Sequence, residues 1–158
     1  MTLDAGATGA DDIAIRPAVA ADTDQIAALY LTSFGATYTF ALSHSDDQVR
    51  AWVRDVLVPA GHAIVAVDGG VIVGFAVVEP GDLDQLYVAP DRLGQGIGRR
   101  LLDGAKARSP DGLALYTFQV NERARGFYER NGFVADQFGD GSGNDEGQPD
   151  VHYVWRPV

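Results

Sequence analysis

A glycine-rich stretch near the middle of the chain carries residue types that suit anion binding. In YVAPDRLGQGIGRRLL, residues 87–102, Gly94, Gly96 and Gly98 alternate, and a helical pattern of apolar and basic residues follows at once. Glycines let a backbone approach a ligand closely, and the N–H groups of a first helical turn attract negative charge. The stretch therefore indicates either a site for a ligand such as a pyrophosphate or only a tight strand-to-helix turn.

Basic residues gather around this turn although the chain as a whole is acidic, with a net charge of −10. Five of the twelve Lys and Arg residues lie within 92–108, and Arg123, Arg125 and Arg130 follow. This gathering favours an anionic ligand, while two helices with solvated basic faces are the alternative. A surface with so much negative charge repels nucleic acid, so we expect no DNA or RNA partner.

Two common phosphate-binding motifs do not fit the glycine turn. A P-loop needs Lys and then Ser or Thr after its last glycine, whereas Arg99 and Arg100 follow Gly98. A dinucleotide-binding fold needs G-x-G-x-x-G after its first strand, but Arg99 replaces the third glycine and the turn comes late in the chain. We therefore expect neither a nucleoside triphosphatase nor a Rossmann enzyme.

Hydrophobic periodicity places the turn inside one mixed α/β domain. Asn121 is expected to be an N-cap, and two pairs, Asp22 with Gln25 and Ser45 with Gln48, are expected to cap helices. The expected fold is a central mixed, mostly antiparallel sheet of about seven strands, flanked by about four helices. The expected strands lie at 13–19, in a hairpin over 62–80, and at 82–88, 112–120, 133–140 and 151–158, and the expected helices at 22–34, 45–61, from 97 onward and at 121–132.

Composition excludes several classes of site. The chain has no cysteine, so there is no disulfide scaffold, thiol nucleophile or thiolate metal site, and His62 and His152 lack the spacing of metal ligands. We expect no metal. Residues 1–12 are expected to form a mobile tail without the features of a signal peptide, and residues 13–158 one domain. No apolar run is long enough to span a bilayer, so we expect a cytoplasmic protein without a membrane partner.

Two motifs, in order, resemble those of the GNAT superfamily of acyl-CoA-dependent N-acyltransferases. LDQLYVAPDRLGQGIGRRLL resembles its motif A, Gln/Arg-x-x-Gly-x-Gly/Ala after a strand, and NERARGFYERNGF resembles its motif B. The order of elements matches from about residue 13 to about residue 155. The resemblance implies an enzyme that transfers an acetyl group from acetyl-CoA to a primary amine of a small molecule or peptide by direct attack. Leu93 departs from the motif, because Gln or Arg is usual there.

The resemblance also implies where acetyl-CoA binds. It places the pantetheine along a strand edge at Leu86 and Val88, where the backbone pairs with its amides as with an added strand. It implies that Asn121 contacts the cofactor in addition to capping its helix. The residues implied to hold the pyrophosphate are Leu93, Gly94, Gly96, Gly98 and Arg99.

The resemblance implies that Tyr128 is the general acid that protonates the CoA thiolate, whereas its helical spacing alone fits a core residue. Asp82 and Asp84 are the candidates for the general base, and Asp82 stands where relatives often carry a Glu base. Strict alternation along the strand puts both on the same face as Leu86 and Val88. The alternative is that both carboxylates are solvated.

The acceptor is expected to be a cationic amine. A late loop is acidic, and the segment 34–40, FGATYTF, is aromatic and apolar, which suits a positive charge. With a net charge of −10, acidic loops that are merely solvated are the alternative. A non-catalytic acyl-CoA sensor and a phosphate-binding protein of unrelated fold are the competing functions. A homodimer is expected from the resemblance alone. The acidic residues of the late loop are Asp140, Asp145, Glu146 and Asp150.

Overall fold

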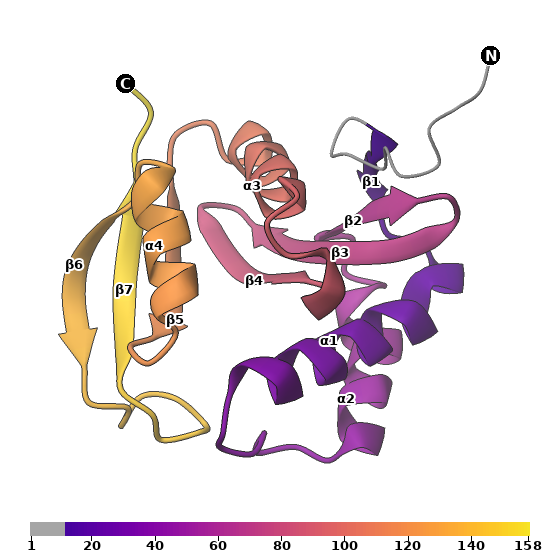
Figure 1. Cartoon of the computed structure of the whole chain (residues 1–158), viewed down its shortest axis with the longest axis horizontal. Coiled ribbons are helices and arrows are strands. Elements are labelled where there is room, and N and C mark those ends of the chain that lie inside the picture. Colours follow the sequence, from indigo (N-terminus) through magenta and orange to yellow (C-terminus); the bar gives the residue numbers. More distant parts are fainter. Residues whose placement is uncertain (1–11) are drawn as a thin grey trace.

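The computed structural model describes residues 12–158, so nearly all of the expected N-terminal tail lies outside the described residues. Seven strands form one sheet in the order β1-β2-β3-β4-β5-β7-β6 (Figure 1). The pair β4–β5 is parallel, and the other neighbouring strands are antiparallel. The mixed, mostly antiparallel sheet of seven strands with four α-helices, expected from the sequence, is confirmed.

Helices and strands follow one another in mixed order along the chain, with short helical turns between some of them. Two 3-10 turns lie at Ala20–Asp22 and Pro90–Arg92, and a π-helical segment at Val53–Leu57 follows the second helix. The helices are α1 (Thr23–Thr37), α2 (Asp46–Trp52), α3 (Ile97–Arg108) and α4 (Glu122–Arg130). The strands are β1 (Ala14–Pro17), β2 (Ala63–Asp68), β3 (Val71–Glu79), β4 (Asp82–Val88), β5 (Leu113–Phe118), β6 (Val134–Gly139) and β7 (Asp150–Trp155).

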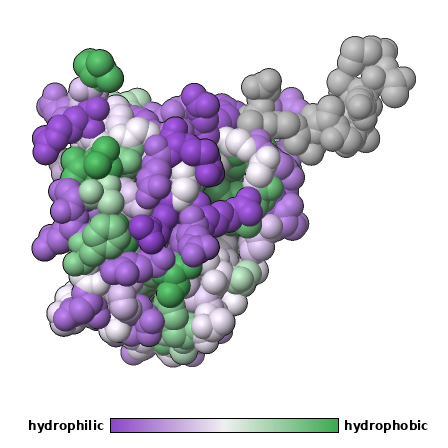
Figure 2. All heavy atoms as spheres, turned by 60° about the vertical axis from the view of Figure 1, so that its left-hand side comes forward, coloured by the Kyte–Doolittle hydropathy of each residue, from purple (hydrophilic) through white to green (hydrophobic). Residues whose placement is uncertain are grey.

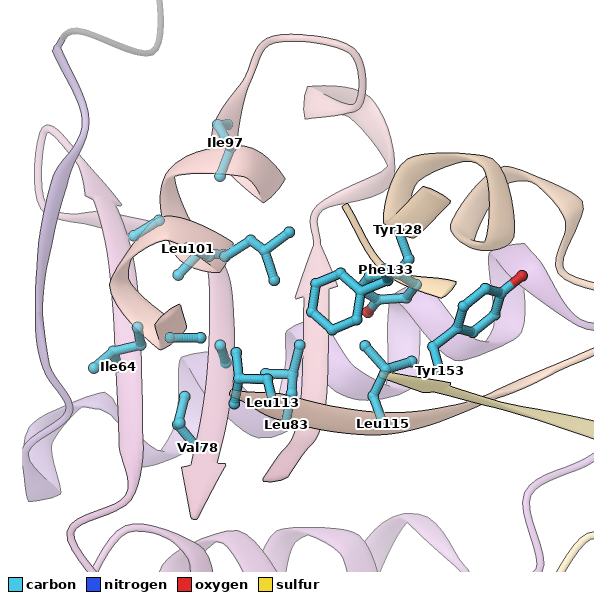
Figure 3. Close-up of a cluster of buried hydrophobic side chains, with 14 of the residues drawn as sticks. Ile64, Val78, Leu83, Ile97, Leu101, Leu113, Leu115, Tyr128, Phe133 and Tyr153 are labelled. Atoms are coloured by element: carbon cyan, nitrogen blue, oxygen red, sulfur yellow. The ribbon is translucent and has the colours of Figure 1, made fainter. Parts of the chain in front are cut away.

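Helices cover both faces of the sheet and form two hydrophobic cores. The pair α1 and α2 packs on one face, where Ile26 and Val53 meet Phe75 of β3. On the other face Leu101 of α3 and Tyr128 of α4 belong to one continuous cluster with strands from both halves of the sheet (Figure 3). Each large apolar side chain buried in this way contributes about 1.5–3 kcal/mol. The site described below lies between elements that these two cores hold.

The outer strand β6 is less covered than the centre of the sheet. Seen from this side, apolar side chains reach the surface between hydrophilic ones (Figure 2). Val134 and Phe138 of β6 are 68% and 59% exposed. The Arg125 guanidinium lies over the Phe138 ring, with its central carbon 5.6 Å from the ring centre. This cation–π contact covers part of the exposed surface.

Local capping agrees with the sequence at two of three expected places. The Ser45 hydroxyl accepts a hydrogen bond from the Gln48 backbone N–H, and the Gln48 side chain accepts one from the Ser45 N–H. Asn121 caps α4 by accepting a hydrogen bond from the Ala124 N–H at 3.1 Å.

The hairpin between β2 and β3 turns at Gly69 and Gly70, whose positive φ angles of +58° and +84° suit a type I′ turn.

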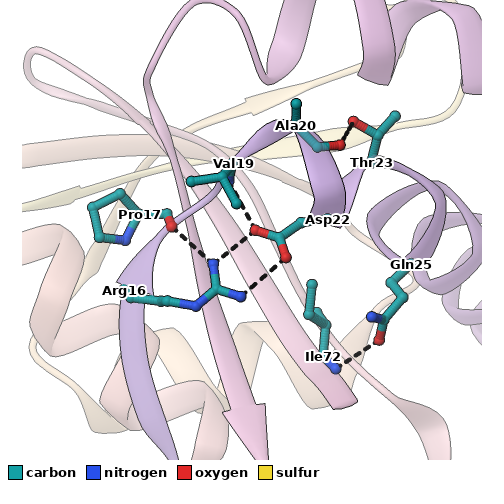
Figure 4. A network of polar contacts seen from close by, with 8 residues as sticks. All are labelled: Arg16, Pro17, Val19, Ala20, Asp22, Thr23, Gln25 and Ile72. Atoms are coloured by element: carbon teal, nitrogen blue, oxygen red, sulfur yellow. Dashed lines mark hydrogen bonds and ion pairs between the residues drawn. The ribbon is translucent and has the colours of Figure 1, made fainter. Parts of the chain in front are cut away.

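The expected capping pair of Asp22 and Gln25 is wrong, because both side chains bind elsewhere (Figure 4). The Asp22 carboxylate accepts two hydrogen bonds from Arg16, at 2.7 and 3.0 Å, and one from the Val19 N–H. Hydrogen bonding to Arg16 lowers the pKa of Asp22. The Gln25 side chain accepts a hydrogen bond from the Ile72 N–H and so ties α1 to β3. An ion pair with Arg16 and a long-range bond to Ile72 therefore replace the expected cap.

The sheet opens between β4 and β5. These parallel strands are paired only at Asp82 and Ala114, and beyond that point they separate (Figure 1). The rest of β4 therefore pairs with β3 alone. This opening is the structural feature that creates the candidate site.

Candidate active site

A cavity of about 1000 Å³ fills the opening between β4 and β5. Its walls come from α1, β4, the glycine turn, β5, α4 and the loop before β7. Asp82, the carboxylate favoured from the sequence, is not among the lining residues. The sequence-predicted residues that do line it are Asp84, Leu86, Val88, Leu93, Gly94, Gly96, Gly98, Arg99, Asn121 and Tyr128.

The glycine turn presents backbone rather than side chains to this cavity. Gly94 and Gly96 have φ angles of +79° and +83°, which only glycine adopts readily. Gly96 is the N-cap of α3, and no side chain caps this helix. A Cβ atom added at Gly98 would lie 3.4 Å from the Phe127 ring. The first-turn N–H groups of α3 have no partner within the helix, so the turn fits an anionic group such as a pyrophosphate.

Four arginines line the cavity and give its wall a positive charge, and one of them, Arg92, comes from the 3-10 turn before the glycines. Arg99 comes from α3, as expected, whereas Arg123 and Arg130 come from α4. Their spacing of seven residues is two helical turns, so both share one face of α4. That spacing is readable in the sequence, but the cavity that this face meets is not.

Arg92, which also lines the cavity, and Arg100 have structural partners. The Arg92 guanidinium donates to the Asp68 carboxylate at 2.8 Å and to the Gln95 side chain at 2.9 Å, and so braces the turn against the β2–β3 hairpin. Arg100 donates to the Ile13 carbonyl and does not line the cavity. The basic cluster seen in the sequence is therefore divided between the cavity and the scaffold.

The open edge of β4 offers main-chain hydrogen-bonding groups to the cavity. The Ala89 N–H donates to the Val73 carbonyl at 2.9 Å. Because hydrogen-bonding direction alternates along a strand, the N–H and C=O groups of Leu86 and Val88 point away from β3. The Val88 carbonyl accepts a hydrogen bond from the Ser33 hydroxyl at 3.3 Å. This edge can pair with an extended ligand that carries amides.

A bulge in β4 decides how its two carboxylates lie. Val77 pairs with Gln85 and Val78 with Leu83, so Asp84 is an extra residue in β4. Leu83 consequently joins Leu86 and Val88 in the core beside α3. The expected common face of Asp82, Asp84, Leu86 and Val88 is therefore wrong, because the bulge breaks the alternation.

Asp84 has the surroundings of a proton acceptor. Desolvation raises its pKa, and the negative charges of Glu79 and Asp82 raise it further. A carboxylate with a raised pKa is a stronger base than an ordinary aspartate. Its position in the cavity distinguishes it from Asp82.

Tyr128 lies on α4 with its side chain 7% exposed. The rings of Phe127, Phe133 and Tyr153 surround it at centroid distances of 5.2 to 6.2 Å. Burial, and secondarily the nearby Tyr38, raises the pKa of Tyr128 well above its ordinary range. The phenol therefore stays protonated at neutral pH and can act only as a proton donor there.

The side of the cavity away from the arginines is aromatic and acidic. The rings of Phe34, Tyr38 and Phe118 line it, and Phe40 packs against them in tilted and edge-on contacts. Glu146 and Asp150 supply carboxylates to this wall.

The other two acidic residues of the late loop lie outside the cavity lining. Asp140 accepts a hydrogen bond from the Ser142 N–H within its own turn, and Asp145 lies 3.6 Å from the His44 ring nitrogen.

Asn121 caps α4 as expected, and a side-chain N–H of Asn121 also donates to the Tyr38 hydroxyl at 2.8 Å. No sequence signal pointed to that contact.

Within residues 12–158 no helix is long and apolar enough to cross a bilayer. Over the same residues, no group of three His, Asp or Glu side chains lies close enough together to hold a metal ion.

Comparisons with known proteins add an independent observation. A family model described as the acetyltransferase (GNAT) domain matches residues 59–135. The chain is 31% identical over 121 residues to the peptidyl-lysine N-acetyltransferase YjaB of Salmonella typhimurium. The aligned region covers 77% of this chain and 83% of that protein.

Solved structures share the fold. The apo form of YjaB from Escherichia coli has a TM-score of 0.76 at 26% identity, covering 92% of this chain and 99% of the other. The PaiA N-acetyltransferase of Thermoplasma acidophilum, solved in complex with coenzyme A, has a TM-score of 0.68 at 20% identity and covers 92% of this chain and 99% of the other. The second likeness concerns the fold alone.

Proposed function

Because the chain belongs to the GNAT acetyltransferase family and is an N-acetyltransferase, we propose that its cavity binds acetyl-CoA and a primary amine at opposite ends. The observation that carries this proposal is the opening between β4 and β5 beside the uncapped N-terminus of α3. An acyl-CoA sensor without turnover and a phosphate-binding protein of unrelated fold are not supported by the family.

The glycine turn holds the pyrophosphate of acetyl-CoA in this proposal. Leu93, Gly94, Gly96, Gly98 and Arg99 lie at the anion-binding end, and the glycines leave room for close approach. Because Leu93 cannot donate from its side chain, its contribution is its backbone.

The open strand edge and α4 complete the donor site. Leu86 and Val88 pair through their main-chain groups with the pantetheine amides, as an added strand does. Asn121 lies beside this path and is proposed to contact the donor with its remaining side-chain N–H, since one N–H already binds Tyr38. Acetyl-CoA, once bound, supplies a thioester whose carbonyl carbon is open to attack by an amine.

Asp84 and Tyr128 are proposed to move the protons. A lysine-like amine has a pKa of about 10, so only about 0.1% is neutral at pH 7, and a base must remove its proton. Asp84 is preferred to Asp82 as this base, directly or through a water, because Asp84 lines the cavity. Tyr128 then donates its phenolic proton to the leaving thiolate.

The acceptor is proposed to be a cationic primary amine, such as a lysine side chain in a peptide. The aromatic wall of Phe34, Tyr38 and Phe118 suits an ammonium group, and Glu146 and Asp150 give it a negative potential. The relative from Salmonella typhimurium is named for a peptidyl-lysine acceptor, which supports the same class here.

Two measurements test this function. Acetyl-CoA at about 100 times its Kd should add about 2.7 kcal/mol of stability and raise the melting temperature by several degrees, whereas ATP and NADH should not. A panel of amines and lysine peptides should then show release of free CoA. An equal thermal response to all three nucleotides, or no CoA release with any amine, would contradict the proposal.

A further inference from the structure

The sheet consists of two halves that touch along one short contact. The strands β1 to β4 form one half and β5, β7 and β6 the other, joined within the sheet only at Asp82 and Ala114. The proposed acid and base, Tyr128 and Asp84, belong to different halves. Asp84 lies on β4, whereas Tyr128 lies on α4 and packs against Tyr153 of β7. Their separation therefore depends on the core that Tyr128 shares with both halves and on the contacts that cross the open end of the gap.

Tyr38 spans the open end of the gap by a hydrogen bond. It is the residue at which α1 ends, and its backbone N–H donates to the Phe34 carbonyl at 3.0 Å. Its hydroxyl accepts a hydrogen bond from the Asn121 side chain at 2.8 Å, and Asn121 in turn caps α4 through the Ala124 N–H. The chain of contacts runs from the end of α1 to the first turn of the helix that carries Tyr128.

The ring of Tyr38 spans the gap as well. It packs on Phe34 of α1 at a centroid distance of 4.7 Å and meets Phe118, at the end of β5, edge-on at 5.2 Å. Burial raises the pKa of Tyr38, although hydrogen bonds from Asn121 and Thr117 oppose that rise. The ring thus packs on α1, while the hydroxyl bonds to groups of the other half.

We propose that Tyr38 is a positioning residue, which holds α4 against α1 through Asn121 and so sets the distance between Tyr128 and Asp84. The inference rests on the proposed function, because it takes those two residues as acid and base. A second contact spans the same end of the gap, where Ser43 donates to Glu146 from its hydroxyl at 2.8 Å. Loss of the Tyr38 bond should therefore loosen the opening without unfolding the protein.

Two variants break the Tyr38–Asn121 bond from opposite sides. Tyr38→Phe keeps the ring and removes the acceptor, while Asn121→Ser keeps a good helix cap but is too short to reach Tyr38. A misplacement of about 1 Å can cost about 10²-fold in rate, so we expect a partial loosening to lower kcat about 10-fold. The KM for acetyl-CoA should change less than about threefold in Tyr38→Phe, and the double variant should be no worse than Asn121→Ser alone.

The width of the opening can be measured without turnover. Because the chain has no cysteine, Thr32 on α1 and Gln137 on β6, both exposed, can be replaced by cysteines and spin-labelled. We expect a narrow distance distribution for the parent protein and a broader one for Tyr38→Phe and for Asn121→Ser. Tyr153→Phe is the matched control, because its hydroxyl binds Glu129 and Arg125 of α4 from within the same half, and its distribution should stay narrow.

The proposal is overturned if Tyr38→Phe retains the parent kcat, or if its distance distribution stays as narrow as that of the parent. It is also overturned if Tyr153→Phe broadens the distribution equally. Melting temperatures show whether each variant is folded, and Asn121→Ser gives the same test should Tyr38→Phe fail to fold. If the parent protein acetylates no amine, the proposed function fails, while the distances still decide whether Tyr38 holds the two halves together.

Discussion

At the scale of single residues, the phenol of Tyr128 is enclosed by aromatic rings and lines the cavity. Tyr128→Phe removes only the hydroxyl, so packing should be preserved. As the general acid, the hydroxyl should contribute about 10²–10⁴-fold in kcat, with the Kd of acetyl-CoA little changed. Steady-state kinetics with a lysine peptide and calorimetry with acetyl-CoA measure the two quantities. A variant with the parent kcat would make Tyr128 a packing residue only.

The carboxylate of Asp84 predicts a pH dependence. Its base form is the ionised form, so kcat/KM should fall as the pH drops through its pKa, which desolvation and neighbouring carboxylates raise. Asp84→Asn should lower kcat/KM and abolish that acid limb, whereas Asp82→Asn should leave the limb in place. A pH–rate profile of the three proteins checks this, and an unchanged profile in Asp84→Asn would assign the base elsewhere.

The raised pKa of Asp84 also affects the stability of the folded protein. A folded-state pKa above the unfolded value means that ionised Asp84 is disfavoured by folding. Stability should therefore decrease as the pH rises through the raised pKa. Asp84→Asn should consequently unfold at the same or a higher temperature than the parent protein at pH 7. A clearly lower melting temperature would show that the carboxylate supports the fold.

At the scale of elements, a substitution in the glycine turn is expected to change ligand binding without changing the fold. Gly98 lies in the first turn of α3 without a positive φ, and an added Cβ would meet the Phe127 ring at 3.4 Å, an ordinary contact. Gly98→Ala should therefore fold normally. The new methyl group should obstruct the backbone approach to the pyrophosphate and raise the KM for acetyl-CoA about tenfold.

Gly35→Ala is a matched control for that variant. Gly35 lies on α1, and a Cβ there would meet nothing within 4 Å. Helix propensity predicts a gain of about 0.5–1 kcal/mol and an unchanged KM for acetyl-CoA. Thermal melts and donor titrations compare the pair. If Gly98→Ala binds acetyl-CoA as tightly as Gly35→Ala, the turn does not hold the donor.

At the scale of the whole molecule, the net charge of −10 should steer a cationic acceptor. Raising the ionic strength from low to physiological should raise the KM for a lysine peptide, because screening weakens that attraction. The double variant Asp145→Asn with Glu146→Gln should flatten this dependence, since Glu146 lines the cavity and Asp145 lies next to it in the loop.

A second double variant controls for net charge alone. Asp103→Asn with Asp111→Asn also removes two negative charges, from exposed positions at α3 and the turn after it. KM at several salt concentrations should keep its full dependence in this protein. An equal flattening in both double variants would mean that total charge, rather than the late loop, attracts the acceptor.

The sequence alone predicted the elements and the glycine turn that lines the cavity. Seven strands and four helices follow from hydrophobic periodicity, and the caps at Ser45 and Asn121 follow from contacts three residues apart. Gly94, Gly96 and Gly98 mark their turn because a backbone with positive φ and a close approach both demand glycine. These features are local, so the order of residues suffices to predict them.

Tertiary structure alone decided the features that depend on strand register and on which polar groups meet in the folded chain. The bulge at Asp84 broke the alternation that had placed Asp82 and Asp84 on one face, and of these two candidates Asp84 lines the cavity. Arg16, 6 residues before Asp22, took the carboxylate expected to cap α1, and Tyr38, 83 residues before Asn121, took a side-chain N–H of that cap. The physical reason is the same in each case. A polar group binds the partner that folding brings to it, and hydrogen-bonding patterns in one segment do not contain the geometry of another.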